Sequence, residues 1–268
     1  MKLIVFLVII GSMHCISTSY GAEDMSVEQR FRKLLRYDWE ETFYDPFTES
    51  WQTYWFLDGE KATLVQSHEG LDFWAGPDAW DDESHAVLWT RQCYAGDLKI
   101  EFEYTRLDSA IKFVNIIFIQ ATGSGLPGYD KDIIKWKDRR STPAMSKYFL
   151  NMNTLHISYA AYGTQNKDPN LDYVRARRYL PSLKGLRGSE LEPDYSETGL
   201  FDSNIPHKIT IIKKDQDLFM HVKNPENETV FHWKNEKFPP IHEGRIGLRH
   251  MYTRGARYNN FRIFKLKN

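Results

Sequence analysis

Residues 154–163 read TLHISYAAYG, and residues 173–179 read YVRARRY. A polar, turn-rich insert at residues 164–172 separates the two runs. Both runs alternate in character with a period of two. This period is typical of β-strands, because successive side chains of a strand point to opposite faces. The stretch therefore predicts two successive strands of a β-sheet.

The alternation assigns each side chain to one of two faces. One face is expected to carry small, aliphatic and aromatic residues that belong to a core: Leu155, Ile157, Tyr159, Ala161, Val174 and Ala176. The other face is expected to carry an imidazole, phenols and guanidinium groups: His156, Ser158, Tyr162, Tyr173, Arg175 and Arg177. Such groups can bind an anion and transfer a proton, so this second face is the candidate functional surface.

The rest of the chain predicts one β-sandwich. From residue 39 onward, short strand-like runs are separated by Gly, Asp and Asn turns, and helices do not alternate with strands. This pattern is typical of an all-β antiparallel sandwich or jelly roll. We therefore expect a single domain at residues 39–268, preceded by a lead-in helix within residues 22–38. Long loops are expected at residues 123–146 and 180–203, and loops of this length are usually functional.

Residues 1–21 have the features of a secretory signal peptide. Lys2 precedes a short apolar run at residues 3–10, and small residues follow at Ser19 and Gly21. The apolar run is too short to span a bilayer as a helix. We therefore expect export, to the periplasm or to the medium. The alternative is a lipoprotein anchored at Cys15.

Composition narrows the range of partners. The 268 residues have a formal net charge of -1. The chain therefore lacks the overall positive charge that would attract it to nucleic acid or to an anionic membrane. Aromatic residues make up 15% of the chain and include eight Trp. Flat rings stack on the apolar faces of sugars, but the core of a large sandwich also needs aromatic residues. Composition alone leaves both uses open.

Seven motifs resemble a known family. They are residues 85–89 (HAVLW), 96–97 (GD), 103–108 (EYTRLD), 115–120 (NIIFIQ), 155–162 (LHISYAAY), 175–178 (RARR) and 243–252 (EGRIGLRHMY). The chain between residues 39 and 264 resembles the YesU-like family, a group of unassigned function in the concanavalin A-like lectin/glucanase superfamily. The resemblance implies a jelly roll of two sheets with a concave face that takes saccharides. It also implies an association with the degradation of uronic-acid polysaccharides such as rhamnogalacturonan and ulvan.

The polar face suits β-elimination on a uronic acid. This reaction removes the proton at C5, beside the carboxylate, and expels the substituent at C4. An enzyme must therefore neutralise the carboxylate and supply a base and an acid. We expect His156 and Tyr162 to be the catalytic pair. The residues expected to bind the anionic oligosaccharide are Gln120, Ser158, Tyr173, Arg175, Arg177 and Arg249. Expulsion of a sugar would define a lyase, and expulsion of water a dehydratase.

Two other functions compete with this hypothesis. A non-catalytic glycan-binding module would use the same face without a proton shuttle. A glycoside hydrolase would use paired carboxylates, and residues 192–197 do show the spacing E-x-D-x-x-E. Pro193 and nearby glycines argue against a strand there. The chain has no H-E-x-x-H motif and no paired cysteines, so no metal cofactor is expected, although a structural calcium ion stays open.

Overall fold

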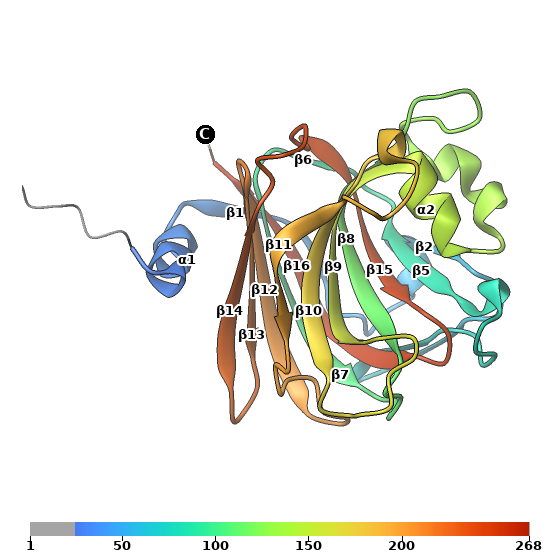
Figure 1. Cartoon of the computed structure of the whole chain (residues 1–268), viewed down its shortest axis with the longest axis horizontal. Coiled ribbons are helices and arrows are strands. Elements are labelled where there is room, and N and C mark those ends of the chain that lie inside the picture. Colours follow the sequence, from blue (N-terminus) through green and yellow to red (C-terminus); the bar gives the residue numbers. More distant parts are fainter. Residues whose placement is uncertain (1–24, 268) are drawn as a thin grey trace, which may run out of the picture.

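Two antiparallel sheets pack face to face in a computed structural model that describes residues 25–267 (Figure 1). Sheet A has the order β14-β13-β12-β7-β16-β4-β3, and β1 also pairs with β16. Sheet B has the order β11-β10-β9-β8-β15-β5-β2, and β6 also pairs with β15. Each sheet has eight strands, which confirms the predicted antiparallel sandwich.

The strands of sheet A are β1 (Trp39–Asp45), β3 (Thr63–Ser67), β4 (Gly70–Trp74), β7 (Leu98–Arg106), β12 (Pro206–Lys214), β13 (Asp217–Lys223), β14 (Glu228–Lys234) and β16 (Gly255–Leu266). Those of sheet B are β2 (Trp55–Asp58), β5 (Ala86–Thr90), β6 (Tyr94–Ala95), β8 (Phe113–Gly123), β9 (Met152–Tyr162), β10 (Asp172–Tyr179), β11 (Glu190–Ser196) and β15 (Glu243–His250). The helical turns are α1 (Val27–Leu35), η1 (Trp51–Thr53), η2 (Asp82–Ser84), η3 (Ile133–Arg140), α2 (Met145–Asn151) and η4 (Pro181–Leu183).

The main core lies between the inner faces of the two sheets. Alternation places Ile100 and Phe102 of β7 in this core, together with Ile157 of β9 and Val174 of β10. Burial of these apolar side chains is the principal force that holds the sheets together. The core also contains a polar pair, because the hydroxyls of Tyr159 and Tyr258 are hydrogen-bonded at 2.9 Å.

Helix α1 lies on the outer face of sheet A, beside β14 (Figure 1). Ser26 and Gln29 form a capping box at its N-terminus, which satisfies backbone groups that have no partner within the helix. Phe31 packs against Ile212 and Phe219 and fixes the helix to the sheet. No helix within residues 25–267 is long and apolar enough to cross a membrane. The predicted signal peptide and Cys15 lie outside the described residues.

The predicted loop at residues 180–203 is wrong in part, because it contains η4 and the strand β11. Proline is tolerated at sheet edges and in bulges, where no ladder hydrogen bond is needed. Strand β11 is the edge strand of sheet B, and Pro193 lies in a bulge between Leu191 and Tyr195. Pro193 therefore does not exclude a strand here, contrary to the expectation from the sequence. The bulged edge still does not place Glu192, Asp194 and Glu197 on one regular face.

Candidate functional site

The predicted polar face is the outer face of sheet B. Val174 and Ala176 belong to the core between the sheets, so Arg175 and Arg177 point away from it, as predicted. In the strand register, Arg177 is opposite His156, and Arg175 is opposite Ser158. On the other side of β9, Phe118 is opposite His156. Neighbouring strands lie about 4.8 Å apart, so these side chains form rows across the sheet.

Tyr162 does not share this face, so its predicted partnership with His156 is wrong. A β-bulge between Ser158 and Ala161 inserts one extra residue, and Ala160 at its centre has a φ of 44°. A bulge reverses the alternation beyond it, so Ala161 faces outward and Tyr162 inward. The Tyr162 hydroxyl accepts a hydrogen bond of 3.0 Å from Nη1 of Arg106, which belongs to sheet A.

Gln120 is also displaced from the predicted face by a bulge. The register of β8 shifts between Ile119 and Thr122, and Gln120 has a φ of 54°. Its Nε2 atom donates to the backbone oxygens of Gly96, at 2.9 Å, and Tyr94, at 3.2 Å. The side chain is fully buried and ties β8 to the segment around β6. The structure therefore does not bring Gln120 together with the other predicted site residues.

Four side chains form what we call the outer-face cluster: His156, Ser158, Tyr179 and Arg249. None of them is more than 4% exposed. The Nε2 atom of His156 lies 2.7 Å from Oγ of Ser158, and its ring centroid lies 4.8 Å from that of Tyr179. The Nδ1 atom of His156 and the hydroxyl of Tyr179 have no hydrogen-bond partner among the described residues. The cluster thus contains buried polar groups that the protein itself does not satisfy.

Electrostatics set the protonation states of this cluster. Burial, and then the guanidinium groups of Arg177, Arg249 and Arg175, hold the pKa of His156 well below its ordinary value. His156 is therefore neutral near pH 7. Burial raises the pKa of Tyr179, so its phenol is protonated. The cluster offers one neutral imidazole as a proton acceptor and one phenol as a donor.

Arg249 is the most unusual member of the cluster. It is fully buried, and its Nη2 atom donates to the backbone oxygen of Pro143 at 2.9 Å. Its Nε and Nη1 atoms have no acceptor within residues 25–267. Four other buried arginines each form an ion pair with an aspartate: Arg106 and Arg254 with Asp108, Arg140 with Asp58, and Arg245 with Asp132. A buried charge normally has such a partner, so Arg249 differs from these four arginines in lacking one among the described residues.

Arg175 and Arg177 are occupied by neighbouring carboxylates. Arg175 pairs with Asp194 at 2.6 Å, and Arg177 pairs with Glu190 at 2.8 Å. Both acids lie on the edge strand β11. Arg175 is the more exposed of the two guanidinium groups, with 29% of its side chain accessible, and it lies over the ring of Tyr173. Arg175 and Tyr173 therefore form the accessible border of the site, whereas Arg177 is held by Glu190.

A roof covers one part of this face. It consists of residues 124–151, which we call the roof segment and which contain η3 and α2 (Figure 1). The Oδ2 atom of Asp58 on β2 accepts hydrogen bonds from Arg140 at 2.5 Å and from Tyr148 at 3.0 Å. Trp89 donates to the same oxygen at 2.8 Å. A single buried carboxylate thus holds both helical turns of the roof segment to the sheet.

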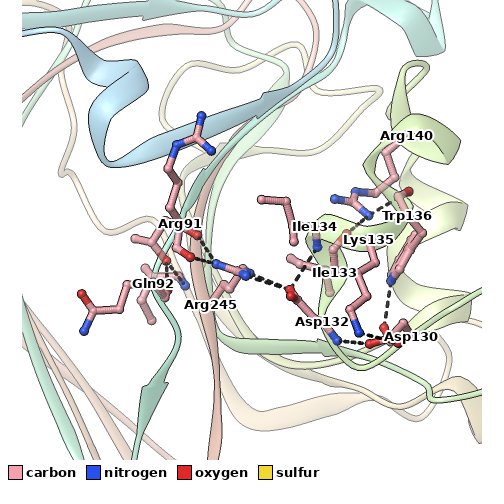
Figure 2. A network of polar contacts seen from close by, with 12 residues as sticks. Arg91, Gln92, Asp130, Asp132, Ile133, Ile134, Lys135, Trp136, Arg140 and Arg245 are labelled. Atoms are coloured by element: carbon pink, nitrogen blue, oxygen red, sulfur yellow. Dashed lines mark hydrogen bonds and ion pairs between the residues drawn. The ribbon is translucent and has the colours of Figure 1, made fainter.

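Two further contacts hold the roof segment. Arg245 of β15 donates to the side chain of Asp132 at 2.7 Å, as Figure 2 shows. Arg245 also donates to the backbone oxygens of Thr90, the last residue of β5, and of Arg91. At its base, the backbone nitrogen of Ser124 donates to the oxygen of Asn151 at 2.8 Å. The segment is therefore closed at its base and held to the sheet by Asp58 and Arg245. The His156 ring on this face is 2% exposed, so it does not open to solvent.

An exposed aromatic group borders the same face. Trp80 is 57% exposed, and its φ of 71° is rare for a residue other than glycine. Its ring packs edge-on against Phe113 and lies 6.3 Å from the ring of Tyr252. Tyr252 follows Arg249 by three residues, just beyond the end of β15. Trp80 therefore supplies an exposed flat ring at this end of β15.

Tyr179 belongs to the outer-face cluster but is absent from the site residues predicted above. Its position in the sequence nevertheless indicates which face of the strand it occupies. Residues 173, 175, 177 and 179 share one parity, so Tyr179 follows Arg177 onto the outer face. No comparable signal exists for Asp58 or Tyr148, because they meet only through the tertiary fold. The described residues contain no group of three or more His, Cys, Asp or Glu side chains placed to hold a metal ion.

Comparison with known proteins identifies the fold. Neither a family model nor a curated protein matches the chain. A Bacillus subtilis protein of unknown function with a galectin-like fold superposes with a TM-score of 0.64 and 18% identity, over 85% of this chain and 98% of that chain. Two further domains are also similar. The VIP36 exoplasmic/lumenal domain in its Ca2+/Man3GlcNAc-bound form has a TM-score of 0.53 and 12% identity, over 86% of this chain and 91% of that chain.

The second is a legume lectin-like domain from Entamoeba histolytica, with a TM-score of 0.51 and 7% identity, over 81% of this chain and 92% of that chain. These identities are low, so the likeness defines the fold alone. The chain has a lectin-like jelly-roll sandwich, which confirms the fold class expected from the sequence. The finer resemblance to the YesU-like family stays a prediction.

Proposed function

We propose that this protein binds acidic oligosaccharides on the outer face of sheet B. Arg249 carries the proposal, because its buried guanidinium group has two nitrogen atoms without acceptors among the described residues. Its strand position is level with that of Ser158, with Ile116 of β8 between them. A carboxylate or sulfate group would supply the missing acceptors through charge-assisted hydrogen bonds. The lectin-like fold supports a saccharide as the carrier of that anion.

The surroundings suit the rest of such a ligand. Trp80 can stack on the apolar face of a sugar ring, and Tyr173 and Arg175 border the face from the other side. Arg249 itself lies beneath Pro143 and Tyr148. We infer that binding shifts this part of the roof segment, so that the anion reaches the Nε and Nη1 atoms of Arg249.

Calorimetric titration with defined oligosaccharides tests this proposal. Uronic-acid oligosaccharides should bind, their neutral counterparts should bind at least tenfold more weakly, and added salt should weaken the acidic ligands only. Trp80→Ala should weaken binding by about tenfold, because a lost aromatic stack costs roughly 1–1.5 kcal/mol. Val65→Ala, at an exposed position on β3, is the matched control. Equal affinity for acidic and neutral ligands would contradict the proposal.

A second candidate function is β-elimination in the same site. The observation that favours it is the contact of His156 with Ser158 at 2.7 Å, beside Tyr179. Arg249 would neutralise the substrate carboxylate, neutral His156 would take the C5 proton, and Tyr179 would protonate the group leaving C4. Tyr179 thus takes the place of Tyr162 as the partner of His156. The product would carry a C4=C5 double bond, and either a sugar or water would leave.

Ultraviolet absorbance and mass spectrometry after incubation with uronic-acid oligosaccharides separate the two functions. New absorbance with chain cutting identifies a lyase, and new absorbance with loss of water identifies a dehydratase. If the oligosaccharides bind but no product forms between about pH 5 and 9, the protein is a non-catalytic binding module. This pH range brackets the titration of histidine. We also propose that the protein is exported and that it belongs to the YesU-like family. Recovery of a mature chain that lacks residues 1–21 outside the cytoplasm would support export.

A further inference from the structure

A second buried arginine without a carboxylate partner among the described residues lies on the other side of β10. Arg178 is 2% exposed, and alternation points it away from the face that carries Arg177 and Tyr179. Its Nε atom donates to the backbone oxygen of Pro239 at 3.4 Å, and its Nη1 atom donates to the backbone oxygen of Tyr179. The guanidinium fork has five N–H groups, so these two bonds leave donors available for a ligand.

No carboxylate within residues 25–267 forms an ion pair with Arg178. Burial lowers the pKa of Arg178 to about 10. The four buried arginines that have aspartate partners, described above, show the usual solution in this chain. A buried ion without a counter-ion destabilises the fold, so an external anion would be favoured here.

Arg178 lines a cavity of about 290 Å³ at one end of the sandwich. The cavity lies between the end of β8, the start of β9 and residues 239–243. Lys131, at its rim, adds a second positive charge, and Glu243 is the one acid in the described wall. Asn153 adds a side-chain amide, and two prolines give an apolar side. The cavity therefore has room, a buried cation and hydrogen-bond donors.

We propose that this end cavity binds a small oxyanion, a carboxylate or sulfate group, with Arg178 as its principal ligand and Lys131 at the rim. The anion is either a free inorganic ion or the acidic group of a sugar. The site is separate from the outer-face cluster, because Arg178 and Arg177 point to opposite faces of β10. Lys131 belongs to the roof segment, and its backbone oxygen accepts from Gly123 at 2.9 Å. An anion in the cavity would thus also hold the base of the roof segment.

The test follows the side-chain amide of Asn153 by nuclear magnetic resonance, because this group lies in the cavity wall and reports on this site alone. Sodium sulfate, sodium glucuronate and neutral glucose are titrated separately at low ionic strength. Both anions should shift the Asn153 resonance, and glucose should not. Stronger binding of glucuronate than of sulfate assigns the site to a sugar acid, and equal binding assigns it to the oxyanion alone.

Variants make the test decisive. Arg178→Gln should weaken binding at Asn153 at least tenfold, because it removes charge-assisted hydrogen bonds. Arg32→Gln, in the exposed part of α1, is the matched control and should change nothing. If Arg178→Gln does not fold, the same titration is made with variants of two exposed residues at the rim of the cavity. Lys131→Gln should weaken anion binding several-fold, and Glu243→Gln should strengthen it. The proposal is overturned if neither anion shifts Asn153, if a folded Arg178→Gln binds like the wild type, or if both rim variants leave the affinity unchanged.

Discussion

Asp58→Asn should destabilise the fold severely, although it changes one oxygen to an NH2 group. The Asp58 side chain is completely buried, and its Oδ2 atom accepts from Arg140, Trp89 and Tyr148 at 2.5–3.0 Å. A hydrogen bond to a charged acceptor contributes about 1.5–3 kcal/mol, whereas a neutral one contributes about 0.5–1.5 kcal/mol. Three weakened bonds therefore lose roughly 3–4 kcal/mol.

An independent estimate agrees with this value. The substitution leaves the guanidinium group of Arg140 buried without a counter-ion, and breaking a buried ion pair in this way costs about 3–5 kcal/mol. Typical domains unfold with a free energy of about 5–15 kcal/mol. Asp58→Asn should thus remove a large share of the stability and release the roof segment first.

Urea unfolding monitored by tryptophan fluorescence measures the loss directly, because Trp89 lies against Asp58. Asp78→Asn is the matched control, since Asp78 pairs with Lys61 at 3.3 Å on the surface and should contribute at most about 1 kcal/mol. A double variant, Asp58→Asn with Arg140→Met, should recover part of the loss because no unpaired charge remains. A measured loss of less than about 1 kcal/mol for Asp58→Asn, the level of a surface pair, would refute this reasoning.

Three further predictions concern histidines and packing. Burial lowers the pKa of His85 to about 2 and that of His250 to about 3, from 6.5. Both bind fewer protons when folded, so stability should fall as the pH drops below about 6.5, by roughly 1.9 kcal/mol per histidine between pH 7 and 5 in urea titrations. Gly247→Ala should destabilise the fold by about 1–3 kcal/mol in thermal and urea unfolding, because its Cβ would lie 2.5 Å from the ring of Trp89. If the site is catalytic, His156→Ala should lower turnover by roughly 10²- to 10⁴-fold. A folded variant with full turnover would make His156 structural.

The sandwich and most of the outer face could be predicted from the sequence because both depend on local alternation. Val174 and Ala176 point inward while Arg175 and Arg177 point outward, as a period of two requires. This rule fails where a residue is inserted into a strand. The bulge at Ala160 moved Tyr162 to the inner side. Nothing in the residue types of TLHISYAAYG marks the position of that bulge.

The closure of the site could not be predicted, because it depends on contacts between distant residues. Asp58 and Tyr148 are 90 residues apart, yet they share a hydrogen bond. The partners of Arg175 and Arg177 come from β11, a strand in a stretch that the residue pattern predicts to be a loop. Alternation along a strand shows which face an arginine occupies, but it does not show whether a carboxylate from a neighbouring strand already neutralises it.

The roof segment enters and leaves the sandwich at one point. Its two ends are joined by the hydrogen bond between Ser124 and Asn151, and they continue directly into the adjacent strands β8 and β9. The cost of closing a loop rises only slowly with its length. The segment can therefore change in length at little entropic cost, provided that a replacement again pairs with Asp58 and Arg245 and covers the apolar outer face of sheet B. The outer face of sheet B could thus be re-covered by a different segment between the same two strands, as long as these two buried carboxylate–arginine pairs are kept.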